Sequence, residues 1–170
     1  PDQYVFDVIS AILSNGRTSR LYKSLIEEKR MAVMAQVYGG PSKYADSFVF
    51  FCSPRHPHTA EEVEKAIYEE LEKLKTAPVT AHELQKIKNQ LEADFIRSLE
   101  SASGLASEIS SYEAISGWRY INTLVEKTIA VTPEDIMRVA NKYFTKTNRT
   151  VAILVKKNKG KEPTDENDKG

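Results

Sequence analysis

The sequence predicts an α+β fold: a small, mainly antiparallel sheet with helices packed on it. Two patterns predict this class: segments with apolar residues at helical spacing, and segments rich in β-branched or aromatic residues. These segments occur in the order helix, helix, strand, strand, several helices, strand. The length and composition agree with it. A chain of 170 residues with 41% hydrophobic and 28% charged residues fits one folded domain.

Two helices are predicted first. Residues 2–13 place Val5, Val8, Ile9 and neighbouring apolar residues on one face, and Gly16 follows as a stop signal. Thr18 or Ser19 can cap the second helix, which ends near residue 29.

Two strands follow, because the apolar spacing then changes from helical to alternating. Residues 31–38 alternate, a Gly-Gly-Pro-Ser loop at 39–42 breaks the run, and residues 47–52 form a second strand. The second strand is apolar on both faces, which predicts a covered central strand. We expect the two strands to pair as antiparallel neighbours.

Capping signals mark several of the later helices. Thr59 with Glu62, and Thr80 with Glu83, have the spacing of a capping box, so helices start there and run to about residues 74 and 99. Further helices are predicted over residues 105–115 and 118–125. Thr132 caps the last helix, which ends by Phe144. Residues 150–155 are predicted as a final strand; residues 1–156 then form the domain and residues 157–170 a disordered polar tail.

Charge and cysteine content exclude some functions. The 24 basic and 24 acidic residues cancel, so no overall positive field favours nucleic-acid binding. No run of 18 apolar residues predicts a membrane span, and Cys52 has no second cysteine with which to form a disulfide. Because the chain starts at Pro1 without a methionine or a signal peptide, we expect it to be a piece of a longer protein.

Candidate chemical groups are few. His82-Glu83 lacks a second histidine one turn later, where Lys86 stands, so His82 is interpreted as a first-turn residue. His56 and His58 flank Pro57 in a polar connection and would need ligands from elsewhere to bind a metal. Cys52 lies on an apolar strand and is interpreted as a packing thiol rather than a nucleophile.

A series of motifs nevertheless resembles the insulinase (pitrilysin) family of zinc peptidases. The similarity is to the C-terminal, non-metal-binding half-domain of mitochondrial processing peptidase subunits and their bacterial relatives, over about residues 1–156. The motifs occur in the family's order: Gly16-Arg17-Thr18-Ser19-Arg20-Leu21-Tyr22, Thr80-Ala81-His82-Glu83-Leu84, Lys88-Asn89-Gln90-Leu91, Val131-Thr132-Pro133-Glu134-Asp135-Ile136 and Lys142-Tyr143-Phe144.

The resemblance implies a role in proteolysis without a catalytic centre in this chain. Family members enclose an extended peptide between two halves, and the zinc motif H-x-x-E-H belongs to the N-terminal domain. This chain is therefore expected to hold no cofactor and to have the zinc-binding domain, or a partner subunit, as its partner. Pro1-Asp2 resembles the dipeptide after the domain's first strand, which implies that this strand is missing here. A bacterial periplasm or cytoplasm is favoured over the mitochondrion.

The family's substrate contacts do not carry over. Many members place an arginine and a tyrosine of this half-domain against the peptide backbone, and the matching positions here are Ile26 and Val33. Neither side chain can form a hydrogen bond. No catalytic, substrate-binding or metal-binding residue is therefore predicted in this chain.

Three interpretations stay open. The chain is a non-catalytic half-domain that shapes a peptidase chamber, a structural subunit such as the peptidase-like core subunits of the cytochrome bc complex, or an unrelated α+β binding module. A missing strand would leave an open sheet edge, so a homodimer of this fragment is also expected.

Overall fold

The computed structural model describes residues 2–39, 44, 47–115 and 117–155. The α-helices are α1 (Gln3–Ser14), α2 (Ala60–Thr76), α3 (Ala81–Ser98), α4 (Ala102–Ile115), α5 (Ile121–Ala130) and α6 (Pro133–Tyr143). A π-helix η1 (Tyr22–Glu28), a 3₁₀-helix η2 (Trp118–Tyr120) and the strands β1 (Ala32–Tyr38) and β2 (Val49–Pro54) complete the described elements. The predicted loop at residues 40–42 and the predicted tail at 157–170 lie outside the described residues.

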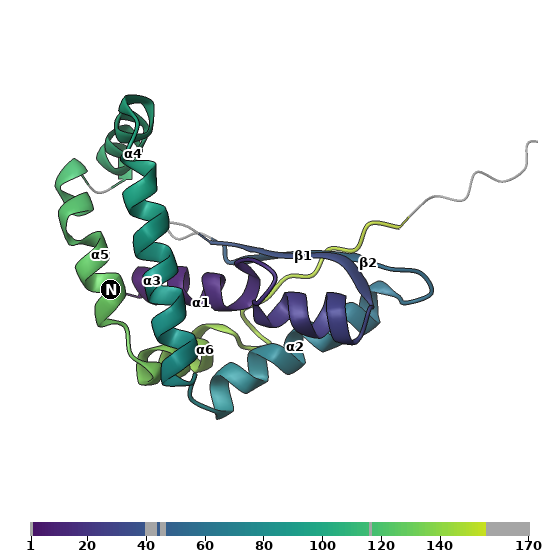
Figure 1. Ribbon diagram of the computed structural model, residues 1–170. Helices are drawn as coiled ribbons and strands as arrows, with labels where there is room; N and C mark the ends of the chain where they lie inside the picture. The colour runs from purple at the N-terminus through teal and green to yellow at the C-terminus, as the bar shows by residue number, and fades with distance from the viewer. Residues whose placement is uncertain (1, 40–43, 45–46, 116, 156–170) are drawn as a thin grey trace, which may run out of the picture.

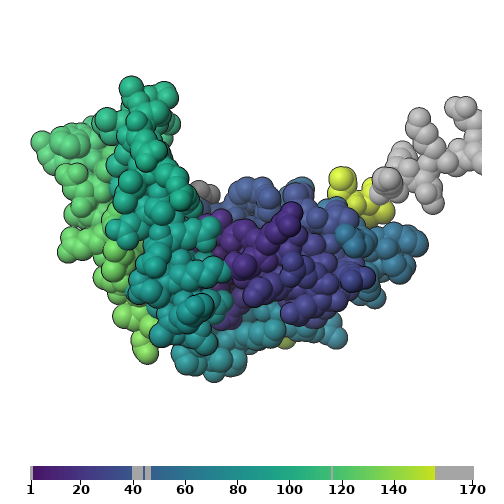
Figure 2. Space-filling view, in the orientation of Figure 1, coloured from purple at the N-terminus to yellow at the C-terminus, as the bar shows by residue number. Residues whose placement is uncertain are grey.

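The molecule has a body and an arm. In Figure 1 the body contains α1, η1, the two strands, α2 and α6, and the arm contains α4, α5 and the part of α3 that rises away from the body. Figure 2 shows the surface hollowed where the teal and green arm meets the purple and blue body. None of the helices in the described ranges combines the length and apolar character that crossing a membrane requires.

Helix α1 is central to the core, as its spacing predicted. Val8, Ile9 and Leu13 have no exposed surface, and the helix contacts β1, α3, α5 and α6. Burial of these side chains supplies the main stabilising free energy, about 1.5–3 kcal/mol for each large aliphatic residue. After α1 the chain turns at Gly16, whose φ of 76° favours glycine.

The second predicted helix is present, but most of it is a π-helix. Leu21 and Leu25 of its apolar face are fully buried, as predicted. Neither Thr18 nor Ser19 caps this helix, because no side-chain hydrogen bond caps the start of η1. The Ser19 hydroxyl instead donates to the Gly16 carbonyl at 2.7 Å. At its end Arg30 adopts φ 50°, and the Met31 N–H donates to the Leu25 carbonyl at 2.9 Å.

The two strands pair antiparallel, as predicted, with Ala35 opposite Cys52 and Gln36 opposite Phe51. The prediction that the second strand is covered on both faces is wrong. Val49 and Phe51 are exposed, whereas Phe50 and Cys52 pack against the core. Among the described elements, helices cover only one face of this sheet, so alternate β2 side chains face outward.

The predicted final strand at residues 150–155 is also not observed. These residues have no strand pairing, and Val151, Ile153, Leu154 and Val155 are all exposed. The sheet of the described residues contains only β1 and β2. Branched aliphatic residues favour an extended backbone, but a strand also needs a hydrogen-bonded neighbour, and the local sequence does not specify one.

Capping residues in the sequence correctly predicted where several helices begin. The predicted capping box of Thr59 and Glu62 is present, and Thr132 caps α6 as predicted, in a capping box with Asp135. Thr80 accepts the Glu83 N–H, but the Glu83 carboxylate binds the Arg20 guanidinium through two hydrogen bonds of 2.9 and 2.7 Å. This ion pair links the turn of chain just before η1 to α3. Helix α4 begins earlier than predicted, at Ala102 rather than near residue 105.

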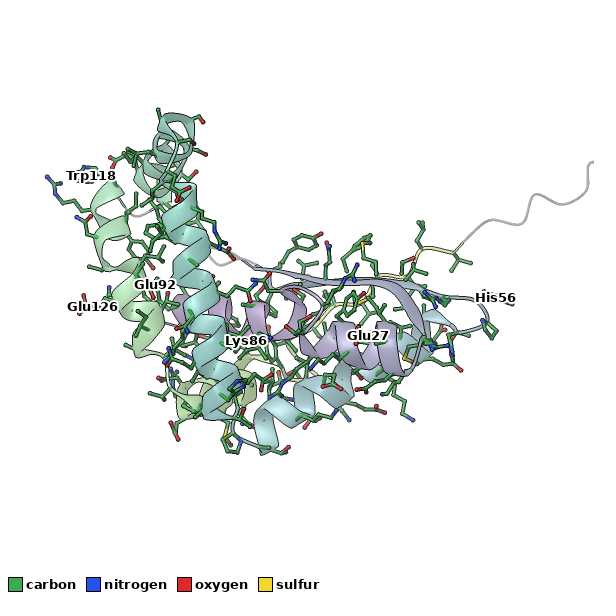
Figure 3. All side chains as sticks on the ribbon, in the orientation of Figure 1. Glu27, His56, Lys86, Glu92, Trp118 and Glu126 are labelled. Atoms are coloured by element: carbon green, nitrogen blue, oxygen red, sulfur yellow. The ribbon has the colours of Figure 1, made fainter. Side chains whose placement is uncertain are left out.

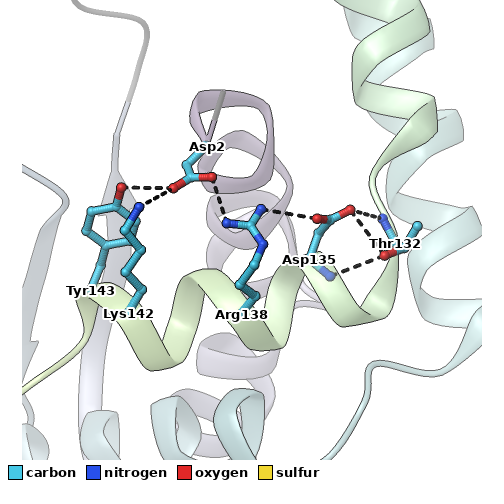
Figure 4. Close-up of polar contacts among 6 residues, drawn as sticks. All are labelled: Asp2, Thr132, Asp135, Arg138, Lys142 and Tyr143. Atoms are coloured by element: carbon cyan, nitrogen blue, oxygen red, sulfur yellow. Dashed lines mark hydrogen bonds and ion pairs between the residues drawn. The ribbon is translucent and has the colours of Figure 1, made fainter.

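Asp2 ties the start of α1 to α6 (Figure 4). Its carboxylate accepts hydrogen bonds from Arg138 at 2.9 Å, Lys142 at 3.1 Å and the Tyr143 hydroxyl at 2.9 Å. The Arg138 hydrogen bond is the largest of the effects that hold the pKa of Asp2 well below its usual range. This carboxylate is therefore ionised throughout the physiological pH range.

Candidate functional site

The outward surface of the sheet is the strongest candidate for a functional surface. We call Val33, Gln36, Tyr38, Val49 and Phe51 the outer sheet face; all five are exposed. The register places Tyr38 opposite Val49 and Gln36 opposite Phe51, so large apolar side chains lie next to one another. Exposed apolar residues gathered in this way indicate contact with another molecule or domain.

The inward surface of the sheet is part of the core. Phe48 and Phe50 pack with Phe6 and Phe144, with ring centroids 5.3 to 6.3 Å apart. Burial raises the pKa of the Cys52 thiol to about 11, so the thiol is protonated at neutral pH and does not act as a nucleophile. The sheet thus separates a packed side from an open side.

The family's arginine and tyrosine positions lie in different environments. Ile26 is half-buried on η1 and packs against the core, whereas Val33 is 53% exposed where the β1–β2 register shifts. The sequence could not distinguish these environments. Val33 belongs to the outer sheet face, and Ile26 contributes to packing.

This difference predicts unequal effects of restoring the family's residues. Ile26→Arg should cost about 1–3 kcal/mol of unfolding free energy, because it places a charge where an apolar side chain packs. Val33→Tyr should change stability by about 0.5 kcal/mol or less, because the site is exposed. Urea denaturation of each single variant tests this, and equal losses from the two variants would contradict the assignment.

The histidines do not come together. His56 is exposed in the connection after β2, at the opposite end of the molecule from Trp118 in the arm (Figure 3). His58 Nδ1 lies 2.9 Å from a Glu62 carboxylate oxygen beside the cap of α2, and His82 is exposed in the first turn of α3. The described ranges contain no group of three or more His, Cys, Asp or Glu residues that could hold a metal ion. The residues described here therefore do not fit a zinc site.

These features define a class: an α+β domain with one open sheet face, and without a metal-binding cluster in its described part. The family profile of the peptidase M16 inactive domain matches residues 1–91. The chain belongs to the peptidase M16 family, of which it carries the inactive domain. This confirms the resemblance to the insulinase family found in the sequence motifs, and the α+β class with it.

Relatives extend this match along the chain. The zinc protease PqqE of Helicobacter pylori is 34% identical over 155 residues, which cover 90% of this chain and 34% of that protein. Mouse mitochondrial cytochrome b-c1 complex subunit 2 is 25% identical over 132 residues, covering 76% of this chain and 28% of that protein. The chain thus spans about a third of the length of these relatives.

A solved structure supports the fold. The inactive peptidase domain from Bordetella parapertussis superposes with a TM-score of 0.74, covering 88% of this chain and 81% of that one. Its sequence identity is 20%, so this likeness concerns the fold alone.

Proposed function

We propose that the domain is the non-catalytic half of a zinc-dependent peptidase, in which the outer sheet face forms part of the wall of a peptide chamber. In this proposal the zinc ion belongs to a separate N-terminal domain or partner subunit. The observation that carries the proposal is the one-sided sheet: its inner face packs on helices, and its outer face exposes Val33, Tyr38, Val49 and Phe51.

Two further points support this role. An open apolar face suits contact with the uncharged backbone and apolar side chains of an extended peptide, or with the other half of a chamber. The relative named as a zinc protease is about three times as long as the matched region, which leaves room for a metal-binding domain elsewhere in it. A catalytic zinc would have to be supplied by such a domain.

A single charge on the outer sheet face tests the proposal in the longer protein that contains this domain and the zinc-binding domain. Phe51→Glu should lower kcat/KM for a quenched peptide by about tenfold or more, because it places a carboxylate in the chamber wall. Ile96→Glu is the matched control: Ile96 and Phe51 are both 54% exposed, but Ile96 lies on α3 in the arm.

The control should retain full kcat/KM, and a metal chelator should abolish cleavage. This chain without the zinc-binding domain should show no cleavage. Equal activity of the two glutamate variants would mean that the outer sheet face does not line the chamber.

The similarity to a cytochrome b-c1 complex subunit favours one alternative, a structural subunit that keeps the fold without proteolysis. The residues that precede this domain distinguish the two roles, since H-x-x-E-H is needed for the catalytic one. A purified longer protein that binds zinc and cleaves peptide supports the first role. A protein without that motif and without cleavage supports the second.

A further inference from the structure

A cavity of about 430 Å³ lies where the arm joins the body. Helix α1 contributes polar residues to it, including Asp7, and helices α3 and α5 contribute the apolar side chains Leu91, Phe95 and Leu124. Its volume is in the range of small-molecule sites, about 300–1,000 Å³. The cavity is separate from the outer sheet face and has no part in the function proposed above.

Most polar groups of α1 in this cavity are already engaged. The Ser14 hydroxyl accepts the Val37 N–H at 3.1 Å and donates to the Ser10 carbonyl, and the Ser10 hydroxyl donates to the Val37 carbonyl. Asp7 differs from them. The hydrogen bond recorded for its carboxylate comes from the neutral amide of Gln3, whose Nε2 donates to Oδ1 at 3.2 Å.

Asp7 also differs from the other carboxylates that are withdrawn from solvent. Asp2 binds Arg138 and Lys142, Glu83 binds Arg20, and Glu70 binds Lys73. In the part of the chain that the structure describes, no cation lies within ion-pair distance of Asp7. Asp7 is half-buried. A carboxylate that is partly removed from water without a cation beside it is costly, so a cation from outside the domain would gain by binding there.

The charged and titratable groups around Asp7 come from several elements. Lys88 and Glu92 of α3 also line the cavity, and Tyr112 of α4 and Tyr120 of η2 interact electrostatically with Asp7. Lys127 of α5 lies over the rings of Tyr4 and Tyr120, 5.2 and 5.7 Å from their centroids. Burial raises the pKa of Asp7 to about 6. The carboxylate is therefore ionised at neutral pH and protonated in mild acid.

The geometry narrows the chemistry of the cation. The amide of Gln3 occupies only one lone pair of Oδ1, so the Asp7 carboxylate keeps open acceptor positions for a cation. A compact ammonium group needs only one such position. The apolar side chains of α3 and α5 suit an aliphatic stem.

We propose that this cavity binds an aliphatic primary amine, with its ammonium group on Asp7 and its stem against Leu91, Phe95 and Leu124. Free alkylamines and lysine side chains share this chemistry.

Titration of the whole chain with n-hexylamine tests the proposal, with the shift of the Asp7 carboxyl resonance as readout. At pH 7.5 the amine should bind at least about tenfold more tightly than 1-hexanol, which has the same stem without the charge. Binding should weaken below pH 6 as Asp7 becomes protonated. A hexanol affinity equal to that of hexylamine, or no saturable amine binding at millimolar concentration, would overturn the proposal.

Variants complete the test by isothermal calorimetry. Asp7→Asn should weaken hexylamine binding by about tenfold or more, whereas Glu126→Gln, an exposed carboxyl on α5, should leave it unchanged. Equal binding by the wild-type chain and Asp7→Asn would also overturn the proposal. A further titration with N-acetyl-lysine methylamide distinguishes the sources: its binding identifies a site open to lysine side chains, and binding of hexylamine alone identifies a site for free amines.

Discussion

Replacing Asp7 with asparagine is expected to stabilise the chain at pH 8 by as much as about 3 kcal/mol. Burial is the main cause that raises the pKa of Asp7 from 3.8 to about 6. Such a difference in the pKa of Asp7 between the unfolded and the folded chain corresponds to about 3 kcal/mol of unfolding free energy once the carboxyl is ionised in both states. An asparagine side chain keeps the acceptor for Gln3 and removes the charge.

The sign of the pH dependence follows from the raised pKa. Below the unfolded-state value of 3.8 the group is protonated in both states, so wild type and Asp7→Asn should have nearly equal stability there. As the pH rises from 3.8 to about 6, the unfolded chain loses this proton while the folded chain keeps it, so the wild type becomes progressively less stable than the variant. The two stability curves should therefore separate between pH 4 and 7.

Urea denaturation at several pH values measures this separation. Glu126→Gln serves as the control. Because Glu126 is an exposed carboxyl on α5, its replacement should change the unfolding free energy without the pH dependence expected for Asp7→Asn. An Asp7→Asn curve parallel to the wild-type curve at all pH values would show that Asp7 is not held in a desolvated environment.

Local interactions explain which parts of the fold were predictable from sequence. The predicted capping box of Thr59 and Glu62 involves residues three positions apart, so its spacing was sufficient, and Thr132 caps the last helix as predicted. Glu83 had the same spacing, yet its carboxylate pairs with Arg20, 63 residues earlier in the chain. Nothing in the local pattern reveals a partner at that distance.

The same limit applies to the candidate sites. Asp7 lies between Phe6 and Val8 on an amphipathic helix, so the local pattern does not mark it as a site, although Asp7, Ser10 and Ser14 have the helical spacing of a polar stripe. The resemblance alone indicates Val33 and Ile26, and the fold places these two residues in different environments. The final predicted strand had suitable residues, but pairing depends on a neighbour that local sequence does not specify.

The geometry of the sheet edges leads to the second prediction. Both backbone groups of Val37 are bonded to serine side chains of α1, so they point away from β2. Backbone groups alternate in direction along a strand, so those of Ala35 also point outward, while Gln36 faces its partner Phe51. Cys52, opposite Ala35, points out of the other edge in the same way. Helix α1 thus occupies the outward groups of Val37, whereas Ala35 on the β1 edge and Cys52 on the β2 edge direct backbone donors and acceptors toward a position where another chain could pair.

We propose that the isolated chain forms a dimer through one of these edges, and expect proline to abolish it. Ala35→Pro removes an outward N–H from the β1 edge, and Cys52→Pro does the same at the β2 edge, while the bonds between β1 and β2 are kept. The variant whose proline lies in the edge that forms the dimer should sediment as a monomer near 19.2 kDa. The variant with proline in the opposite edge should stay dimeric and is the matched control. Circular dichroism should show that both variants are folded. A wild-type chain that is monomeric at high concentration, or a dimer that survives both substitutions, would contradict edge pairing.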